Sequence, residues 1–191
     1  MKKIPLSLFI LFVHITGFSQ DWSEDQLTKA NTAADIQFLS ADEQEAIMYV
    51  NLARLFPQDF VNIELEDVAD LDVANPAYTR SLIARLNKAL PVSPLYFDQT
   101  LYDIAKCFAK ESGKKGTVGH TRKNCPKGYA AECCSYGMKA GWDIALQWLI
   151  DDGVKGNGHR VICLDESYTK IGLSTYPHKK YGICAVADFG R

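Results

Sequence analysis

Several motifs that identify large enzyme classes are missing from this sequence. It has no GxSxG nucleophile elbow, no HExxH zinc motif, no phosphate-binding loop and no GxGxxG dinucleotide fingerprint. The usual sequence signs of an α/β-hydrolase, a zinc protease or a nucleotide-dependent enzyme are therefore absent. Any chemistry must depend on residues outside these motifs.

Excess positive charge and long apolar runs are also missing. The 191 residues carry 21 Lys and Arg against 23 Asp and Glu, so no basic surface of the kind that binds nucleic acid is expected. The apolar run at residues 4–13 is too short to span a bilayer. It follows Lys2 and Lys3 and precedes Gly17 and Ser19, small residues of the kind that a signal peptidase recognises. Residues 1–19 are therefore predicted to be a signal peptide, with a retained membrane anchor as the alternative.

The mature chain would then be exported and would contain no membrane span. Cleavage before Gln20 removes two lysines and no acid, so the formal charge becomes 19 − 23 = −4. About 170 residues remain, enough for one domain with a hydrophobic core. We expect a secreted or periplasmic protein.

All six cysteines follow the predicted cleavage site. An even number in an exported chain predicts disulfides, because the compartment is oxidising. Spacing does not choose among the many possible pairings, although neighbouring cysteines should take different partners. A zinc site is the competing interpretation, but no CxxC pair or HxxxH spacing supports it. The disulfide candidates are Cys107, Cys125, Cys133, Cys134, Cys163 and Cys184.

Helical periodicity dominates the front of the mature chain, and strand alternation dominates its end. Ser40 and Glu43 form a capping box that begins a helix, and Pro57 ends it. Residues 20–39 precede this helix as a weakly patterned N-terminal arm. The other predicted elements are helices at 78–90, 98–109 and 141–151, a loop at 110–119, strands at 171–175 and 181–189, and a turn at 176–180. This order predicts an α+β fold.

Three histidines lie in the mature chain. His178 falls in the lysine-rich turn and is interpreted as a solvated loop residue. His120 and His159 each follow a glycine in a polar segment between strongly patterned helices. Loop residues held by a rigid scaffold are where functional sites tend to form. Two surface histidines, or two helix caps, are the alternative.

Glu132 lies in a segment that is rich in small and aromatic residues. A carboxylate there is costly to bury unless it has a partner. A nearby histidine, a cation or a set of backbone N–H groups would serve. An exposed glutamate, or one that only accepts backbone hydrogen bonds, is the alternative.

A set of short segments resembles, in order, the CAP superfamily, which groups cysteine-rich secretory proteins, antigen 5 and plant pathogenesis-related proteins. The resemblance is to the bacterial, sperm-coating-protein-like branch and runs from about residue 40 to the end. The matching segments are Asn51-Leu-Ala-Arg54, Gly119-His120, Ala131-Glu132-Cys-Cys-Ser-Tyr136-Gly137, Gly158-His159-Arg160, Ile171-Gly172 and Asp188-Phe189-Gly190.

The resemblance implies a three-layer α-β-α sandwich with a central antiparallel sheet over residues 40–191. Residues 58–90 would be an insertion that forms a lid or an additional helical layer. Cys133 and Ile162 stand where the family usually has asparagine. Disulfides are expected to replace the structural hydrogen bonds of those asparagines.

The family has a central cleft lined by two histidines and two acidic residues. By matching segment, the histidines are His120 and His159 and the first acid is Glu132. The second acid follows the helical tryptophan and falls on Asp151, with Asp152 as the substitute.

Two imidazoles beside two carboxylates favour a divalent cation site. The resemblance likewise implies a cation, zinc by preference, held by His120 and His159. With two protein ligands the site would stay open to water or an anionic ligand. The resemblance implies binding of a lipid, another small apolar ligand or an extracellular protein partner, without catalysis.

Two other functions stay open. One is a metal- or His/Glu-dependent hydrolase of peptide or cell-wall substrates. A variant of it uses Cys133 or Cys134 as a nucleophile beside His159, which requires that the cysteine is reduced. The other is an extracellular interaction protein that uses the fold as a scaffold and contacts its partner through residues 58–90.

Overall fold

The computed structural model describes residues 21–66 and 76–191. The predicted signal peptide lies outside these described residues. The helices are α1 (Glu24–Ala30), α2 (Ala41–Leu55), α3 (Pro57–Phe60), the π-helical η1 (Val61–Leu65), α4 (Pro76–Leu86), α5 (Gln99–Lys115), α6 (Gly141–Ile150), the 3₁₀-helical η2 (Lys155–Asn157) and α7 (Gly158–Cys163). The strands are β1 (Tyr96–Phe97), β2 (Ala131–Tyr136), β3 (Lys170–His178) and β4 (Gly182–Gly190).

The four strands form one sheet in the order β1-β3-β4-β2. β4 pairs with β3 in the antiparallel sense, as predicted. On its other side β4 pairs, also antiparallel, with β2, a strand that was not predicted. The short strand β1 joins β3 in the parallel sense, so the sheet is mixed. The predicted α+β class is confirmed.

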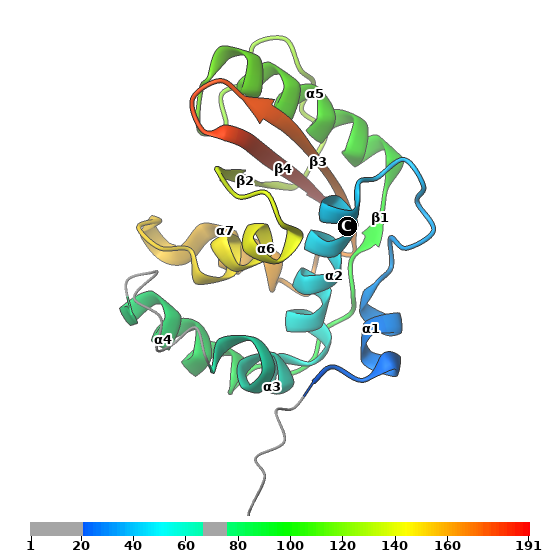
Figure 1. The fold of residues 1–191 in the computed structure, drawn as a ribbon, viewed down its shortest axis with the longest axis vertical. Coiled ribbons are helices and arrows are strands. Elements are labelled where there is room, and N and C mark those ends of the chain that lie inside the picture. Colours follow the sequence, from blue (N-terminus) through cyan, green and yellow to red (C-terminus); the bar gives the residue numbers. More distant parts are fainter. Residues whose placement is uncertain (1–20, 67–75) are drawn as a thin grey trace, which may run out of the picture.

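Helices cover the sheet as separate layers (Figure 1). Helix α5 packs along β3 and β4, while α2, α6 and α7 contact the sheet through β3 and β2. Gly172 in β3 allows α5 to approach closely, because a Cβ at this position would lie 1.9 Å from the backbone N of Tyr102. Among residues 21–66 and 76–191, no helix is long and apolar enough to cross a membrane.

Two buried polar residues of α2 connect distant loops to the core. Asn51 donates to the carbonyls of Ala30 and Leu95 and accepts from the N–H of Leu95. Arg54 is 1% exposed. Its guanidinium donates to four carbonyl oxygens, those of Ser93, Cys163, Asp165 and Tyr168. The first segment of the family resemblance, Asn51 to Arg54, therefore stabilises the fold.

The N-terminal arm and the described part of residues 58–90 pack on the same side of the sheet as α6. Helix α1 contacts α2, and Ala30 is fully buried. Glu64 accepts hydrogen bonds from the indole N–H groups of Trp22 and Trp142, which joins the arm to α6. Arg160 in α7 donates to Ser81 in α4. The described part of 58–90 is therefore largely helical, and a hydrogen bond joins it to α7, the helix that carries His159.

Several predicted boundaries were wrong, including the end of the helix predicted at 78–90, which stops at Leu86. Residues 110–115 continue α5 instead of forming a loop, because Glu111 and Lys115 pair one turn apart at 2.6 Å and the helix ends only at Gly116, whose φ is 70°. Helix α4 begins at Pro76, a residue suited to a first turn. Strand β3 continues to His178, so the chain turns later than predicted.

Candidate functional site

The four cleft residues named from the sequence come from four elements and lie around one pocket. His120 follows α5, Glu132 lies on β2, Asp151 ends α6 and His159 lies in the first turn of α7. The pocket has a volume of about 240 Å³, and His120, Asp151, His159 and Cys134 line it. Glu132 is buried behind His120, with 2% of its side chain exposed.

The imidazole of His120 is oriented by Glu132. Its Nδ1 lies 2.8 Å from Oε1 of the carboxylate. Because an ionised carboxylate can only accept, Nδ1 carries the proton and donates it, which leaves the lone pair of Nε2 available. The His120 side chain is 54% exposed, so the ring can reach a ligand in the pocket.

The imidazole of His159 has the same arrangement. Its Nδ1 donates to Oδ1 of Asp151 at 2.7 Å, and the backbone N–H of His159 donates to Oδ2 at 2.9 Å. Asp151 adopts a left-handed conformation with φ 58°, which turns the chain at the end of α6 towards α7. The ring centres of His120 and His159 are 6.2 Å apart. Each ring therefore has its own buried carboxylate.

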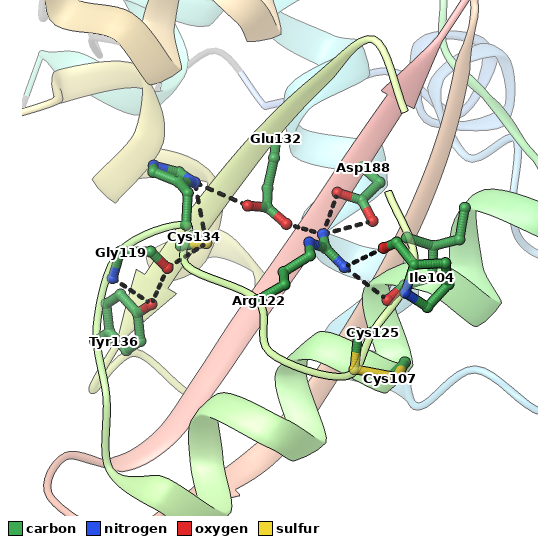
Figure 2. A network of polar contacts seen from close by, with 11 residues as sticks. Ile104, Cys107, Gly119, Arg122, Cys125, Glu132, Cys134, Tyr136 and Asp188 are labelled. Atoms are coloured by element: carbon green, nitrogen blue, oxygen red, sulfur yellow. Dashed lines mark hydrogen bonds and ion pairs between the residues drawn. A yellow bond between two sulfur atoms is a disulfide. The ribbon is translucent and has the colours of Figure 1, made fainter. Parts of the chain in front are cut away.

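A buried arginine holds Glu132 in place (Figure 2). Arg122 forms an ion pair with Oε2 of Glu132 and also donates to both carboxylate oxygens of Asp188, at 3.0 and 3.1 Å. The Arg122 side chain is 1% exposed. Its guanidinium carbon lies 4.4 Å and 4.6 Å from the ring centres of Phe108 and Tyr129, so it is held by aromatic faces as well as by charge.

Sequence reasoning missed this ion-pair cluster. It anticipated that a buried Glu132 needs a partner, but Arg122 was not considered, although it lies two residues after His120. Asp188 was noted only as part of a matching segment, and the pairing of β2 with β4 sets it opposite Glu132. The pKa of Asp188 is raised to about 8, chiefly by burial and also by the Glu132 carboxylate, against the lowering effect of Arg122.

The six cysteines do not behave alike. Cys107 and Cys125 form a disulfide that closes the segment carrying His120 onto α5 (Figure 2), so the predicted disulfides are confirmed for one pair. Contrary to the prediction, four cysteines are buried free thiols, because they pack as small apolar side chains in the core. These four are Cys133, Cys134, Cys163 and Cys184.

The two adjacent thiols are poorly suited to nucleophilic attack. Burial raises the pKa of Cys133 and of Cys134 well above the ordinary thiol value, and the protonated thiol is a weak nucleophile. Cys133 approaches His159 only through the backbone, with Sγ 3.8 Å from the carbonyl oxygen. Cys134 lies beside the other histidine, with Sγ 3.8 Å from Nδ1 of His120.

His178 is a structural residue, and its interpretation as a solvated loop residue was wrong. It is 3% exposed. Its Nε2 donates to the carbonyl of Thr117, and its Nδ1 accepts from the N–H groups of Lys180 and Tyr181. The turn is polar in composition, so nothing in the sequence indicated that backbone groups of Thr117, Lys180 and Tyr181 need this imidazole as a hydrogen-bond partner.

Comparison with known families agrees with this architecture. Residues 48–189 match the family model of CAP, described as the Cysteine-rich secretory protein family. No individual curated protein matches the sequence significantly. Because the family model covers well over half of the sequence, this chain belongs to the CAP family.

Proposed function

We propose that this protein is an exported, non-enzymatic binding protein of the bacterial branch of the CAP family. Its pocket holds a divalent cation, zinc by preference, between His120 and His159, and binds a lipid or another small apolar ligand. The observation that carries the proposal is the pair of pocket-facing imidazoles, each oriented by a buried carboxylate.

The side chains present fit a cation. Metal-bound histidines usually donate their other ring N–H to a carboxylate, which is the arrangement at both His120 and His159. Two imidazoles on one zinc ion have ring centres about 5 to 6 Å apart, and the observed separation is 6.2 Å. A small inward movement of the exposed His120 ring would bring both into range. The cation would supply a positive charge for an anionic ligand group.

Binding is favoured over catalysis by a cysteine nucleophile, because neither thiol described beside the pocket is activated. The nearby thiols are protonated at neutral pH, since burial raises their pKa. The pocket volume of about 240 Å³ is smaller than that of a typical site for a drug-sized molecule. It suits a small ligand or one end of a lipid. The formal charge of the exported chain, 19 − 23 = −4, offers no general attraction for nucleic acid.

Zinc binding tests the cation. We would measure metal content and titrate zinc by calorimetry, using tag-free mature protein and the double variant His120→Ala, His159→Ala. His178→Gln is the matched control, because it removes a histidine outside the pocket, and circular dichroism checks the fold of each protein. We expect one zinc ion in the wild type and in the control and none in the double variant. Equal binding by wild type and double variant would overturn the cation site.

Native mass spectrometry tests the apolar ligand. Protein purified without detergent would be offered a panel of fatty acids, phospholipids and sterols, with the pocket variant Tyr136→Trp as the control. Tyr136 lines the pocket, so a larger ring should block entry. A lipid adduct on the wild type that this variant lacks is the expected result. Absence of any adduct, or equal adducts on both proteins, would overturn lipid binding in this pocket.

A further inference from the structure

We infer that Cys134 provides a thiolate ligand to the cation in this pocket, so that the site selects a thiophilic ion such as Zn²⁺ over Mg²⁺ or Ca²⁺. The inference rests on the proposed function for the existence of a cation. It adds a third protein ligand and a class of ion, because soft thiolate ligands select soft or borderline metals. The Cys134 thiol is protonated in the metal-free protein and would release its proton to solvent when the ion binds, because a metal deprotonates the thiol that coordinates it.

The direction of β2 brings the thiol to the pocket. Side chains alternate along a strand, so Glu132 and Cys134 project from the same face, towards His120, while Cys133 projects from the other. Accordingly, Cys133 packs in the main hydrophobic core and Cys134 in the smaller cluster beneath α5. Figure 2 shows Glu132 and Cys134 on β2 beside the Gly119 loop.

Three donor atoms of different chemistry converge there. One ligand atom from each of His120, Glu132 and Cys134 lies within 4.8 Å of the other two. Within residues 21–66 and 76–191, this is the one group of three or more such side chains that could hold a metal ion. The thiol also lines the pocket, so an ion arriving from solvent can reach it.

The thiol lies beside the ring that would hold the ion. Sγ of Cys134 lies 3.8 Å from Nδ1 of His120, the ring nitrogen that donates to Glu132. The ligand to the ion is the other ring nitrogen, Nε2. A sulfur and a nitrogen bound to the same zinc ion lie about 3.6 Å apart, so the mostly exposed His120 ring would have to turn to bring Nε2 and Sγ onto one ion.

Cys184 provides the contrast that makes the idea testable. It belongs to the same buried cluster as Cys134. Its Sγ faces the carbonyl oxygens of Ala109 and Tyr176, each at 3.5 Å, on the side of α5 and β3. Cys184 is not among the residues that line the pocket, so its removal should leave metal binding unchanged.

Cobalt substitution tests the thiolate ligand directly. Reduced, tag-free protein would be titrated with Co²⁺, because a cobalt–thiolate bond absorbs strongly in the near ultraviolet. We expect this absorption in the wild type and in Cys184→Ser, and we expect it to be lost in Cys134→Ser and Cys134→Ala. Zinc affinity should fall at least about tenfold in both Cys134 variants, and Mg²⁺ and Ca²⁺ should not displace Co²⁺ from the wild type.

The outcomes separate this inference from the proposed function. Co²⁺ bound to the wild type without the thiolate absorption, or an unchanged zinc affinity in the Cys134 variants, would overturn the thiolate and leave the histidine pair intact. Full cobalt–thiolate absorption in His159→Ala would mean that Cys134 binds the ion and His159 does not, which would overturn the histidine pair. A wild type that binds no ion would overturn both. If a variant fails to fold, a wild-type spectrum without the thiolate absorption still overturns the thiolate ligand.

Discussion

Replacing Arg122 by methionine tests whether the buried ion-pair cluster supports the pocket. Methionine can fill the space between Phe108 and Tyr129, but it removes the charge that faces Glu132 and Asp188. Removing one partner of a buried ion pair typically costs about 3–5 kcal/mol, because the other partner stays buried without compensation. We expect a loss at the lower end of this range.

The lower end is expected because one carboxyl can accept a proton. Burial already raises the pKa of Asp188 to about 8, so Asp188 is readily neutralised near neutral pH once Arg122 is gone. Glu132 then carries the remaining uncompensated charge. For a domain of this size, 1 kcal/mol corresponds to about 2–4 °C in Tm. A loss of about 3 kcal/mol therefore predicts a decrease of about 6–12 °C.

Thermal and urea unfolding of metal-free protein would measure this loss. Arg80→Met, at an exposed position of α4, is the matched control and should stay within about 0.5 kcal/mol of wild type. Adding Asp188→Asn to the Arg122 variant should cost little further stability, because Asp188 is already neutral once Arg122 is gone. A decrease in Tm below about 2 °C for the Arg122 variant, or strictly additive effects in the double variant, would refute the reasoning.

Three further results are expected. Asp151→Asn should weaken zinc binding about 10- to 100-fold in calorimetry, because His159 loses its orienting carboxylate. Its Tm should stay similar, because asparagine tolerates a left-handed backbone. An unchanged zinc affinity would contradict this prediction. The double variant Cys107→Ala, Cys125→Ala should lose about 3 kcal/mol in urea unfolding, given its sequence separation of 18, and an unchanged midpoint would count against it. In metal-free protein the free energy of unfolding should fall as pH rises from about 4 towards 8, because folded Asp188 retains a proton that the unfolded chain releases. If the urea midpoint of Asp188→Asn depends on pH as steeply as that of wild type, Asp188 is not the cause.

The elements with strong local signals were predictable from the sequence. The capping box at Ser40 and the cap at Asp98 begin α2 and α5 as expected. β3 and β4 form the predicted strand pair at the end of the chain. β2 was missed because its central residues are buried on both faces, so no polar alternation marks it. α7 was missed because six residues are too few to show a helical period.

The site was predictable in part for a different reason. His120, Glu132, Asp151 and His159 were named from their segments and from the family resemblance, and the structure gathers them around one pocket. Arg122 and Asp188 could not be found in this way, because their contact with Glu132 depends on strand register. Likewise, the choice of Cys107 and Cys125 as the disulfide pair depends on where α5 and the following loop meet.

The two halves of the pocket are held by different physical means. On the His120 side, the orienting carboxylate of Glu132 is fixed by the charge of Arg122. On the His159 side, the carboxylate of Asp151 is fixed by backbone N–H groups at the start of α7, those of His159 and Arg160 at 2.9 and 3.4 Å. A buried charge interaction responds to substitution and to pH, whereas a backbone cap depends on the conformation of a short helix. Perturbing Arg122 should therefore disorder one ring and leave the other in place, because no hydrogen bond or ion pair seen among the described residues joins the two carboxylates.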